Sequence, residues 1–134
     1  MTVVTETGNR AAPELVAAII DRESNGDPNV VSPDGGHGLM QIDERYHKAW
    51  LDLNLWRIPL ENIRYGVSKV LIPNLDHFQG WPAAIAAYNA SWQRVQHIVD
   101  FYGQDVAMLD TVTTHRNYVS WVLNRVQELQ GIAA

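Results

Sequence analysis

The sequence predicts a mainly α-helical protein with a single compact domain. Apolar residues recur at helical spacing along most of the chain, and no segment alternates convincingly between apolar and polar residues. A length of 134 residues is enough for one domain with a proper core. Turn-forming residues crowd the stretch from Asn25 to Gly36, which is therefore expected to be irregular and to have room for a short β-hairpin.

The first helix is expected to run from Pro13 to about Ser24. Proline at the first helical position loses no hydrogen bond, and Glu14 suits the positive end of the helix dipole. A second helix is expected from Glu61 to Phe78, with a kink at Pro73, because its apolar residues form one face. That face comprises Ile63, Val67, Val70, Leu71, Leu75 and Phe78.

Three further helices are expected in the second half of the chain. The segment from Trp81 to Ser91 is rich in alanine, which lets neighbouring helices approach closely, so it is predicted to be central. A shorter helix covers residues 93–102. The last helix begins near Tyr118 and is expected to end at Gly131, because glycine commonly caps a helix C-terminus.

Composition excludes several classes of function. The chain has no cysteine, so disulfides, thiol nucleophiles and zinc–thiolate sites are ruled out. A net charge of −5 without a basic cluster argues against sequence-blind nucleic-acid binding. No apolar run approaches the length of a membrane span, and the polar residues 1–10 lack the apolar core of a secretory signal. We expect a monomer that does not associate with membranes.

Glu23 is the leading candidate for a catalytic residue. Counted from Val16, it shares a helical face with Ile19 and Ile20, where a charge is poorly solvated. Desolvation raises the pKa of a carboxyl group, and a carboxyl that stays protonated near neutral pH is the general acid that glycosidic cleavage needs. On spacing alone, a half-exposed glutamate at a helix end is an equally good interpretation.

Four motifs occur in an order that resembles the lytic transglycosylase and goose-type lysozyme superfamily. The segments are Glu23-Ser24-Asn25-Gly26-Asp27-Pro28, Gly38-Leu39-Met40-Gln41-Ile42, Ala86-Ala87-Tyr88-Asn89-Ala90, and a tyrosine, Tyr118, in the last helix. The stretches from Gly38 to Lys48 and from Thr113 to Tyr118 look most like goose-type lysozymes. The resemblance implies a lysozyme-like fold, with residues 1–12 as an N-terminal extension and residues 13–134 as the catalytic domain.

The resemblance also implies a substrate and roles for individual residues. The substrate is peptidoglycan, with chitin-type oligosaccharides as a further candidate, cleaved between N-acetylmuramic acid and N-acetylglucosamine without a cofactor. Glu23 corresponds to the general acid, and Asp43, with Asp34, to carboxylates that position the attacking water for inverting hydrolysis. The corresponding substrate-binding positions are Met40, Gln41, His47, Tyr88, Asn89 and Tyr118. Serine stands at Ser91, where the family commonly has glycine.

Structural roles compete with several of these assignments. Asp43 suits the N-cap of a short helix through Trp50, and Asp34 suits a turn. Tyr88 and Tyr118 are by default core aromatics. No histidine spacing supports a metal site. Trp50 and Trp56, in a poorly periodic segment, are the preferred candidates for stacking against sugars.

Two other functions compete with hydrolysis. A lytic transglycosylase would use Glu23 alone and close a 1,6-anhydro ring instead of adding water, and Asp43 is the feature that favours hydrolysis over it. A binding module would hold peptidoglycan without cutting it, but such a module has no need of an intact set of site residues. As a hydrolase or as a transglycosylase, the chain is expected to act on the bacterial cell wall. It would reach the wall by a route without a secretory signal, or with a signal that has been removed.

Overall fold

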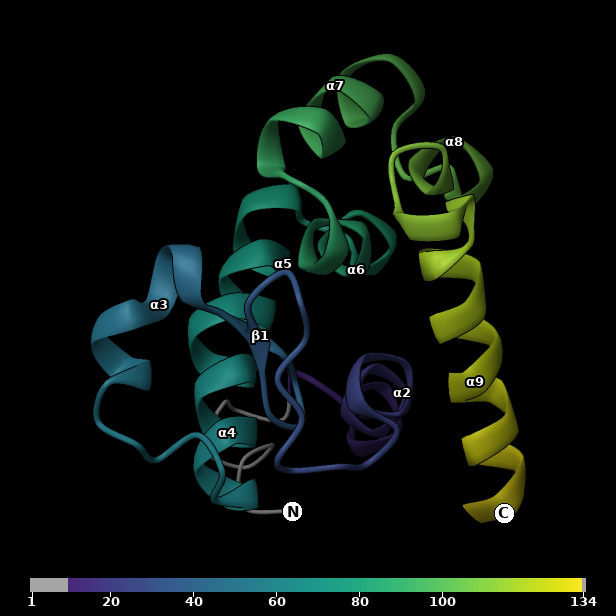
Figure 1. The fold of residues 1–134 in the computed structure, drawn as a ribbon. Coiled ribbons are helices and arrows are strands. Elements are labelled where there is room, and N and C mark those ends of the chain that lie inside the picture. The colour runs from purple at the N-terminus through teal and green to yellow at the C-terminus, as the bar shows by residue number, and fades with distance from the viewer. Residues whose placement is uncertain (1–9, 134) are drawn as a thin grey trace. The chain divides into compact units, whose positions relative to one another are not determined.

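The computed structural model describes residues 10–133 and is mostly helical, with one small antiparallel hairpin (Figure 1). The predicted fold class, mainly α with a short hairpin in the glycine-rich region, is confirmed. The chain divides into two compact units between Ser68 and Lys69. The expected N-terminal extension, residues 1–12, lies outside the described residues except for residues 10–12.

The first unit contains the hairpin and the first helices. Its elements are α2 (Pro13–Ser24), β1 (Gly36–His37), β2 (Ile42–Asp43), α3 (Glu44–Leu51) and α4 (Pro59–Gly66). Helix α2 has the predicted bounds, with Pro13 in its first turn and a buried face that includes Val16 and Ile19. The two strands pair with Gly36 opposite Asp43 and His37 opposite Ile42. This pairing places the end of the hairpin directly before α3.

The expected long helix around Pro73 is divided by a π-helical turn. Helix α4 is followed by the π turn η1 (Val67–Leu71) and then by α5 (Ile72–Phe78). Pro73 lies in the first turn of α5. Proline offers no N–H to the carbonyl four residues earlier and collides with it, and the wider π turn immediately before Pro73 relieves both problems. The predicted disturbance at Pro73 therefore takes the form of a π turn.

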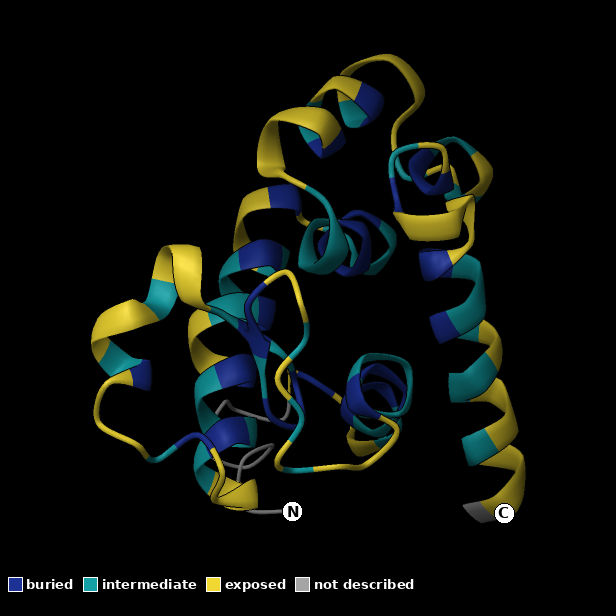
Figure 2. Ribbon diagram, viewed as in Figure 1, coloured by how far each residue is buried: buried dark blue, intermediate teal, exposed yellow. Residues whose placement is uncertain are grey.

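The second unit is built around α6 (Trp81–Asn89), as the alanine-rich sequence predicted. Residues 83–86 of this helix are fully buried (Figure 2), and α6 packs against α5, α7 (Trp92–Tyr102), α8 (Val106–Asp110) and α9 (Tyr118–Ala133). Helix α8 and the short 3₁₀ helix η2 (Thr114–Arg116) were not predicted.

The C-terminus of α9 differs from the prediction, and the N-terminus of α7 explains the serine at position 91. Helix α9 runs through Gly131 to Ala133, so the predicted cap at Gly131 is wrong. Gly131 is not among the glycines of the described chain that have a positive φ, which is the conformation that a glycine cap requires. Ser91 is the N-cap of α7, with a backbone in the extended region and a side chain that accepts a hydrogen bond from the Arg94 N–H. Serine is therefore well suited to this position.

None of the helices between residues 10 and 133 combines the length and the apolar character that a membrane crossing requires.

Candidate active site

Glu23 lies in the last turn of α2, one residue before the helix ends. It is half-buried, and the adjacent face of the helix carries the fully buried Val16 and Ile19. The helix stops because Asn25 adopts a left-handed conformation (φ 52°), from which its N–H bonds back to the carbonyl of Asp21. The chain thus presents Glu23 beside an apolar face but still accessible to solvent, as a general acid must be.

The loop after α2 is tied to the turn of the hairpin. Ser24 accepts a hydrogen bond from the Gly26 N–H at 3.3 Å, which shapes the start of the loop. Further along, the Val30 carbonyl accepts the Gly38 N–H at 2.8 Å and the side-chain amide of Gln41 at 3.3 Å. The first two sequence motifs are therefore linked through the loop in the folded first unit.

Asn62 holds the hairpin turn from α4. Its side chain is fully buried and accepts the Met40 N–H at 2.9 Å, while its amide nitrogen donates to the carbonyls of His37 and Trp56, both at 3.0 Å. A Cβ at Gly38 would lie 2.4 Å from this amide nitrogen, and Gly38 has a φ of +74°. Glycine at this position is therefore required by both the space and the backbone conformation.

The structure gives Met40 and Gln41 clear roles in holding this turn. Met40 is fully buried, and its sulfur lies so close to Gly66 that a Cβ there would be 2.6 Å away. Gln41 has a φ of 53°, and its side-chain amide donates to the carbonyls of Val30 and Gly38. The implied contacts of both residues with sugar remain predictions.

Asp34 lies at the exposed tip of the loop, within a β-turn. The turn is closed by the Gly35 N–H, which donates to the Ser32 carbonyl at 3.0 Å. The Ser32 hydroxyl in turn donates to the carboxylate of Asp34. Asp34 therefore has the turn role that its sequence context suggested, and its catalytic role is untested.

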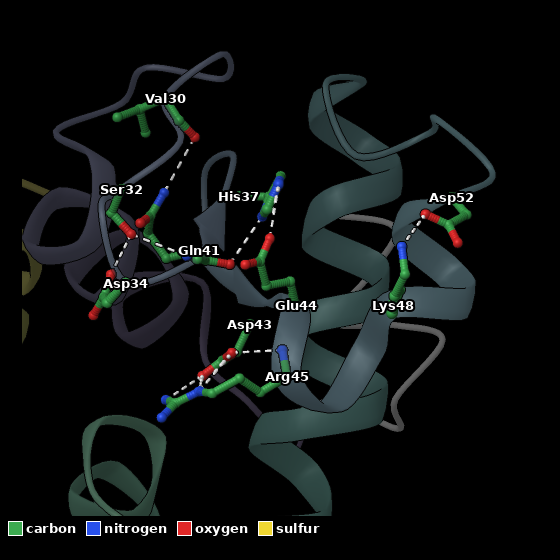
Figure 3. Close-up of polar contacts among 12 residues, drawn as sticks. Val30, Ser32, Asp34, His37, Gln41, Asp43, Glu44, Arg45, Lys48 and Asp52 are labelled. Atoms are coloured by element: carbon green, nitrogen blue, oxygen red, sulfur yellow. Dashed lines mark hydrogen bonds and ion pairs between the residues drawn. The ribbon is translucent and has the colours of Figure 1, made fainter.

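Asp43 caps α3 and is held by Arg45. Its Oδ1 accepts the Arg45 N–H at 2.9 Å, which makes it the N-cap that the sequence allowed. The Arg45 guanidinium donates to both carboxylate oxygens, at 3.1 Å from Nε and 2.6 Å from the terminal nitrogen (Figure 3). Figure 3 shows the arginine side chain folded back against the carboxylate. The carboxylate of Asp43 is therefore paired with a cation.

This pairing sets the protonation of Asp43. Partial burial raises its pKa, but the hydrogen bonds and charge of Arg45 outweigh burial, so the pKa lies below its ordinary value of 3.8. Asp43 is consequently ionised at neutral pH and is a weak base.

His47 lies at an irregular position of α3 and contacts Tyr65. Its backbone leaves helical geometry (φ −132°), and its Nδ1 lies 2.8 Å from the hydroxyl of Tyr65 on α4. Trp50 stacks on the same tyrosine, with its ring centroid 4.1 Å from that of Tyr65. Burial lowers the pKa of His47, although the nearby charge of Asp43 opposes this effect.

Trp56 does not have the surface position expected of a sugar platform. Only 5% of it is exposed; its ring meets His37 edge-on, and the Arg57 guanidinium lies over it, 4.1 Å from the ring centroid. The expectation that Trp56 stacks against a sugar is wrong, because its ring is buried and in contact with other side chains. Trp50 is half-buried and keeps that prediction.

Within the second unit, the third motif contacts the segment that precedes the fourth. Tyr88 and Asn89 end α6, and both are half-buried. The side chain of Asn89 accepts the Thr114 N–H at 2.8 Å and donates to the Thr114 hydroxyl at 3.1 Å. This two-way contact fixes η2 against the end of α6, where the following residues His115 and Arg116 both have a φ of 56°.

Tyr118 begins α9 and is almost completely buried. Its N–H donates to the Thr113 hydroxyl at 3.2 Å. The next two N–H groups, of Val119 and Ser120, donate to the carboxylate of Asp110 at 2.7 and 3.0 Å, and the Thr113 hydroxyl donates to the same carboxylate at 3.0 Å. Asp110 therefore caps α9 from inside the unit and fixes the position of Tyr118.

Between residues 10 and 133, no group of three or more His, Cys, Asp or Glu side chains could hold a metal ion.

A family model described as "Transglycosylase SLT domain" matches residues 3–103, well over half of the chain. This chain belongs to that family. The match includes Glu23 and the hairpin, and it extends through Asn89 into α7. The goose-type lysozyme identity expected from the sequence is not shown by the match and remains a prediction.

One relative is similar to this chain in sequence, and one solved structure is similar to it in fold. A protein of Enterobacteria phage PRD1 named "Transglycosylase" is 36% identical over 77 residues, which cover 58% of this chain and 28% of the phage protein. A solved structure of the 70-kDa soluble lytic transglycosylase in complex with bulgecin A superposes with a TM-score of 0.78 at 24% identity, covering 98% of this chain and 24% of that one. The regions that match this SLT domain cover less than a third of either protein.

Sequence reasoning missed three residues that shape the site region of this SLT domain: Asn62, Tyr65 and Asp110. Asn62 and the buried Gly66 are one turn apart on α4 and therefore share a helix face. A polar residue on the same face as a glycine was the sequence feature that could have indicated a buried polar contact. Asp110 precedes α9 by eight positions, too far for the usual capping patterns of sequence to reveal it.

Proposed function

We propose that this SLT domain is a lytic transglycosylase that cleaves the β-1,4 bond between N-acetylmuramic acid and N-acetylglucosamine in bacterial peptidoglycan. The observation that carries the proposal is the family match, which spans Glu23 at the end of α2. The phage relative, itself named a transglycosylase, supports the same reaction class. The site of action would be the bacterial cell wall.

Glu23 would serve as both acid and base. Its protonated carboxyl donates a proton to the glycosidic oxygen as the bond from that oxygen to C1 of N-acetylmuramic acid breaks. The same carboxylate then accepts the proton of the C6 hydroxyl as O6 bonds to C1. The product is a 1,6-anhydro ring, no water is consumed, and Glu23 ends in the protonated form in which it began.

The environment of Asp43 supports this reaction over hydrolysis. An inverting hydrolase needs a second carboxylate that takes a proton from the attacking water. This carboxylate becomes a less effective base as its pKa falls. The Arg45 contacts lower the pKa of Asp43 and occupy both of its oxygens. A carboxylate held in this way is poorly suited to activating water.

Inverting hydrolysis, with Asp43 and Asp34 positioning water, is the second candidate. It is favoured by the occurrence of both carboxylates in the first unit, together with Glu23. The proposed sugar contacts are common to both reactions. In the first unit the proposed contact is His47, with the Met40–Gln41 turn holding the hairpin, and in the second unit the proposed contacts are Tyr88, Asn89 and Tyr118.

Product analysis on purified peptidoglycan tests the proposal. The chain is incubated with purified cell walls, and the released muropeptides are measured by mass spectrometry. The expected products carry 1,6-anhydro ends and are each lighter by one water than the hydrolysed fragments. Hydrolysed fragments as the main product would establish the second candidate, and no release at all would overturn both. The Glu23→Gln variant is the negative control.

A further inference from the structure

Trp92, in the exposed first turn of α7, forms an aromatic cluster with two residues at the end of α5 that the proposed reaction does not use. Trp92, the first residue of α7, is 43% exposed and stacks on His77, with ring centroids 4.1 Å apart and an angle of 23° between the planes. Phe78 meets both rings edge-on. We call His77, Phe78 and Trp92 the Trp92 platform; Figure 2 shows the start of α7 as exposed.

Two amide side chains, the buried Asn74 and the half-buried Gln96, hold this platform in place. The indole N–H of Trp92 donates to Oδ1 of Asn74 at 2.8 Å, and Asn74 is only 3% exposed. The amide nitrogen of Asn74 donates in turn to the Ala84 carbonyl in the core of the unit. At the other end, Nε2 of His77 lies 2.9 Å from Oε1 of Gln96. Trp92 is therefore fixed in orientation before any ligand binds, so binding does not incur the entropic cost of immobilising this side chain.

The orientation of Trp92 is the reverse of what solvent alone would favour. A half-exposed tryptophan commonly keeps its N–H in contact with water and buries its carbon framework. Here the polar atom is directed into the protein, so the part of the ring that faces water consists of carbon. Exposing such a surface is unfavourable by about 25 cal/mol per Å². A rigid, purely apolar ring surface is what a ligand with an apolar face would cover.

We propose that the Trp92 platform is a subsite for a pyranose ring of a β-1,4-linked N-acetylhexosamine strand. One face of such a ring consists of C–H groups, whose slight positive charge suits the negative face of an indole. Exposed polar side chains for the sugar hydroxyls lie in the same turn, at Gln93 and Arg94. The platform thus combines an apolar ring surface with neighbouring polar side chains, as a polysaccharide ligand requires.

The position of the platform along the chain supports the same ligand. Only Ala90 and Ser91 separate it from Asn89, so the Cα atoms of Asn89 and Trp92 are at most about 11 Å apart. A strand bound at Tyr88 and Asn89 could therefore extend onto Trp92. This inference rests on the proposed function for the identity of the polymer, but its test does not depend on cleavage.

The test uses the full chain with Glu23→Gln, which prevents cleavage, and the hexamer of N-acetylglucosamine as the probe. The Trp92 indole N–H signal is identified in ¹⁵N NMR spectra by its loss in Trp92→Phe. It should shift in a saturable manner as the hexamer is added. Trp92→Ala should weaken binding about three- to tenfold. Phe101→Ala removes a more exposed aromatic, 71% accessible, from the same helix and should change the affinity less than about twofold.

An unmoved Trp92 signal at saturating hexamer would overturn the proposal, whether or not other signals move. An equal loss of hexamer affinity in Trp92→Ala and Phe101→Ala would also overturn the proposal, because it would indicate non-specific binding to exposed aromatic side chains. The NMR measurement on the unsubstituted platform stands even if Trp92→Ala folds poorly. Cleavage by the wild-type chain with an unmoved Trp92 signal rejects only the subsite. A shifted signal without any cleavage rejects only the proposed reaction.

Discussion

Arg45 contacts Asp43 in two ways: its backbone N–H bonds to Oδ1, and its guanidinium bonds to both carboxylate oxygens. The first contact starts α3, and the second neutralises the charge of the carboxylate. A residue that resembles a water-positioning aspartate is thus also the N-cap of a helix and the partner of a cation. The balance between these roles can be measured.

Removing the guanidinium should raise the pKa of Asp43. In Arg45→Ala the N-cap contact remains, but the side-chain hydrogen bonds and the positive charge are lost, so the pKa should move up toward or beyond 3.8. The carboxyl signal of Asp43 in an NMR titration reports this directly. Lys48→Ala breaks a different ion pair on the same helix, with Asp52, and is the control. An unchanged pKa in Arg45→Ala would contradict the assigned cause.

The same shift has a consequence for acid stability. The lowered pKa of Asp43 in the folded chain gives a stabilisation that is complete above 3.8 and is lost as the pH falls through the folded value. Arg45→Ala should therefore lose less stability than the wild type between neutral pH and the acid range. The measurement is the free energy of unfolding of Arg45→Ala and of the wild type, obtained by urea denaturation at neutral pH and at a pH below 3.8.

His47 should titrate below its ordinary pKa of 6.5, because burial disfavours the charged imidazole. Its depressed folded pKa gives a stabilisation that is present above 6.5 and is lost as the pH falls through the folded value. Asp43 opposes the depression, so Asp43→Asn should lower the His47 pKa further. Histidine ring signals in an NMR titration measure both effects. A rise of the His47 pKa in Asp43→Asn would be incompatible with this account.

The helices were more predictable than the contacts between them. Pro13 and the αL residue after Ser24 act locally, so the bounds of α2 could be predicted from neighbouring residues alone. The central position of α6 was also predictable, because a run of alanines allows neighbouring helices to pack closely against it. Gly131 misled the prediction, because glycine permits a helix end without imposing one.

Some structural roles of the candidate site residues were predictable, but the hydrogen-bond network that holds them was not. The N-cap role of Asp43 followed from its place before a helical segment, whereas its capture by Arg45 depends on a side-chain conformation that spacing does not encode. Asn62 joins groups that are 6 to 25 positions away along the chain. Such long-range bonds to backbone atoms leave no periodic trace in a sequence.

Asn62→Ala should destabilise the first unit substantially. The change leaves the Met40 N–H and two backbone carbonyls without their buried partner, which should cost about 2–4 kcal/mol. Chemical unfolding monitored by circular dichroism measures the loss. Asn124→Ala, at an exposed position of α9, is the matched control and should change stability by less than about 0.5 kcal/mol. Equal stabilities of the two variants would refute the role assigned to Asn62.

Glu23→Gln should abolish cleavage while the fold is retained, since the amide keeps the shape of the side chain but donates no acidic proton. The rate of muropeptide release should fall at least about 10²-fold. Glu14→Gln, in the first turn of the same helix, should retain nearly all activity, because Glu14 lies at the opposite end of α2 from Glu23. If Glu23→Gln retained more than a tenth of the wild-type rate, Glu23 would not be the catalytic acid.

Asp43→Asn separates transglycosylation from hydrolysis. Asparagine caps a helix about as well as aspartate, so α3 should remain intact and the change should act mainly on charge. If Glu23 alone performs the reaction, the products of Asp43→Asn should carry 1,6-anhydro ends in the same share as those of the wild type. Mass spectrometry gives that share, and Asp52→Asn, on an exposed residue paired with Lys48, is the control.

The opposite result has an equally definite form. If Asp43 orients water, wild-type products should be mainly hydrolysed and, by proton NMR during early turnover, should carry the inverted α-anomer. Asp43→Asn should then slow hydrolysis strongly and raise the share of anhydro product, because the C6 hydroxyl competes once water is poorly held. That rise would overturn the transglycosylase proposal. A constant share of anhydro product would instead assign Asp43 to the cap of α3 and to its ion pair with Arg45.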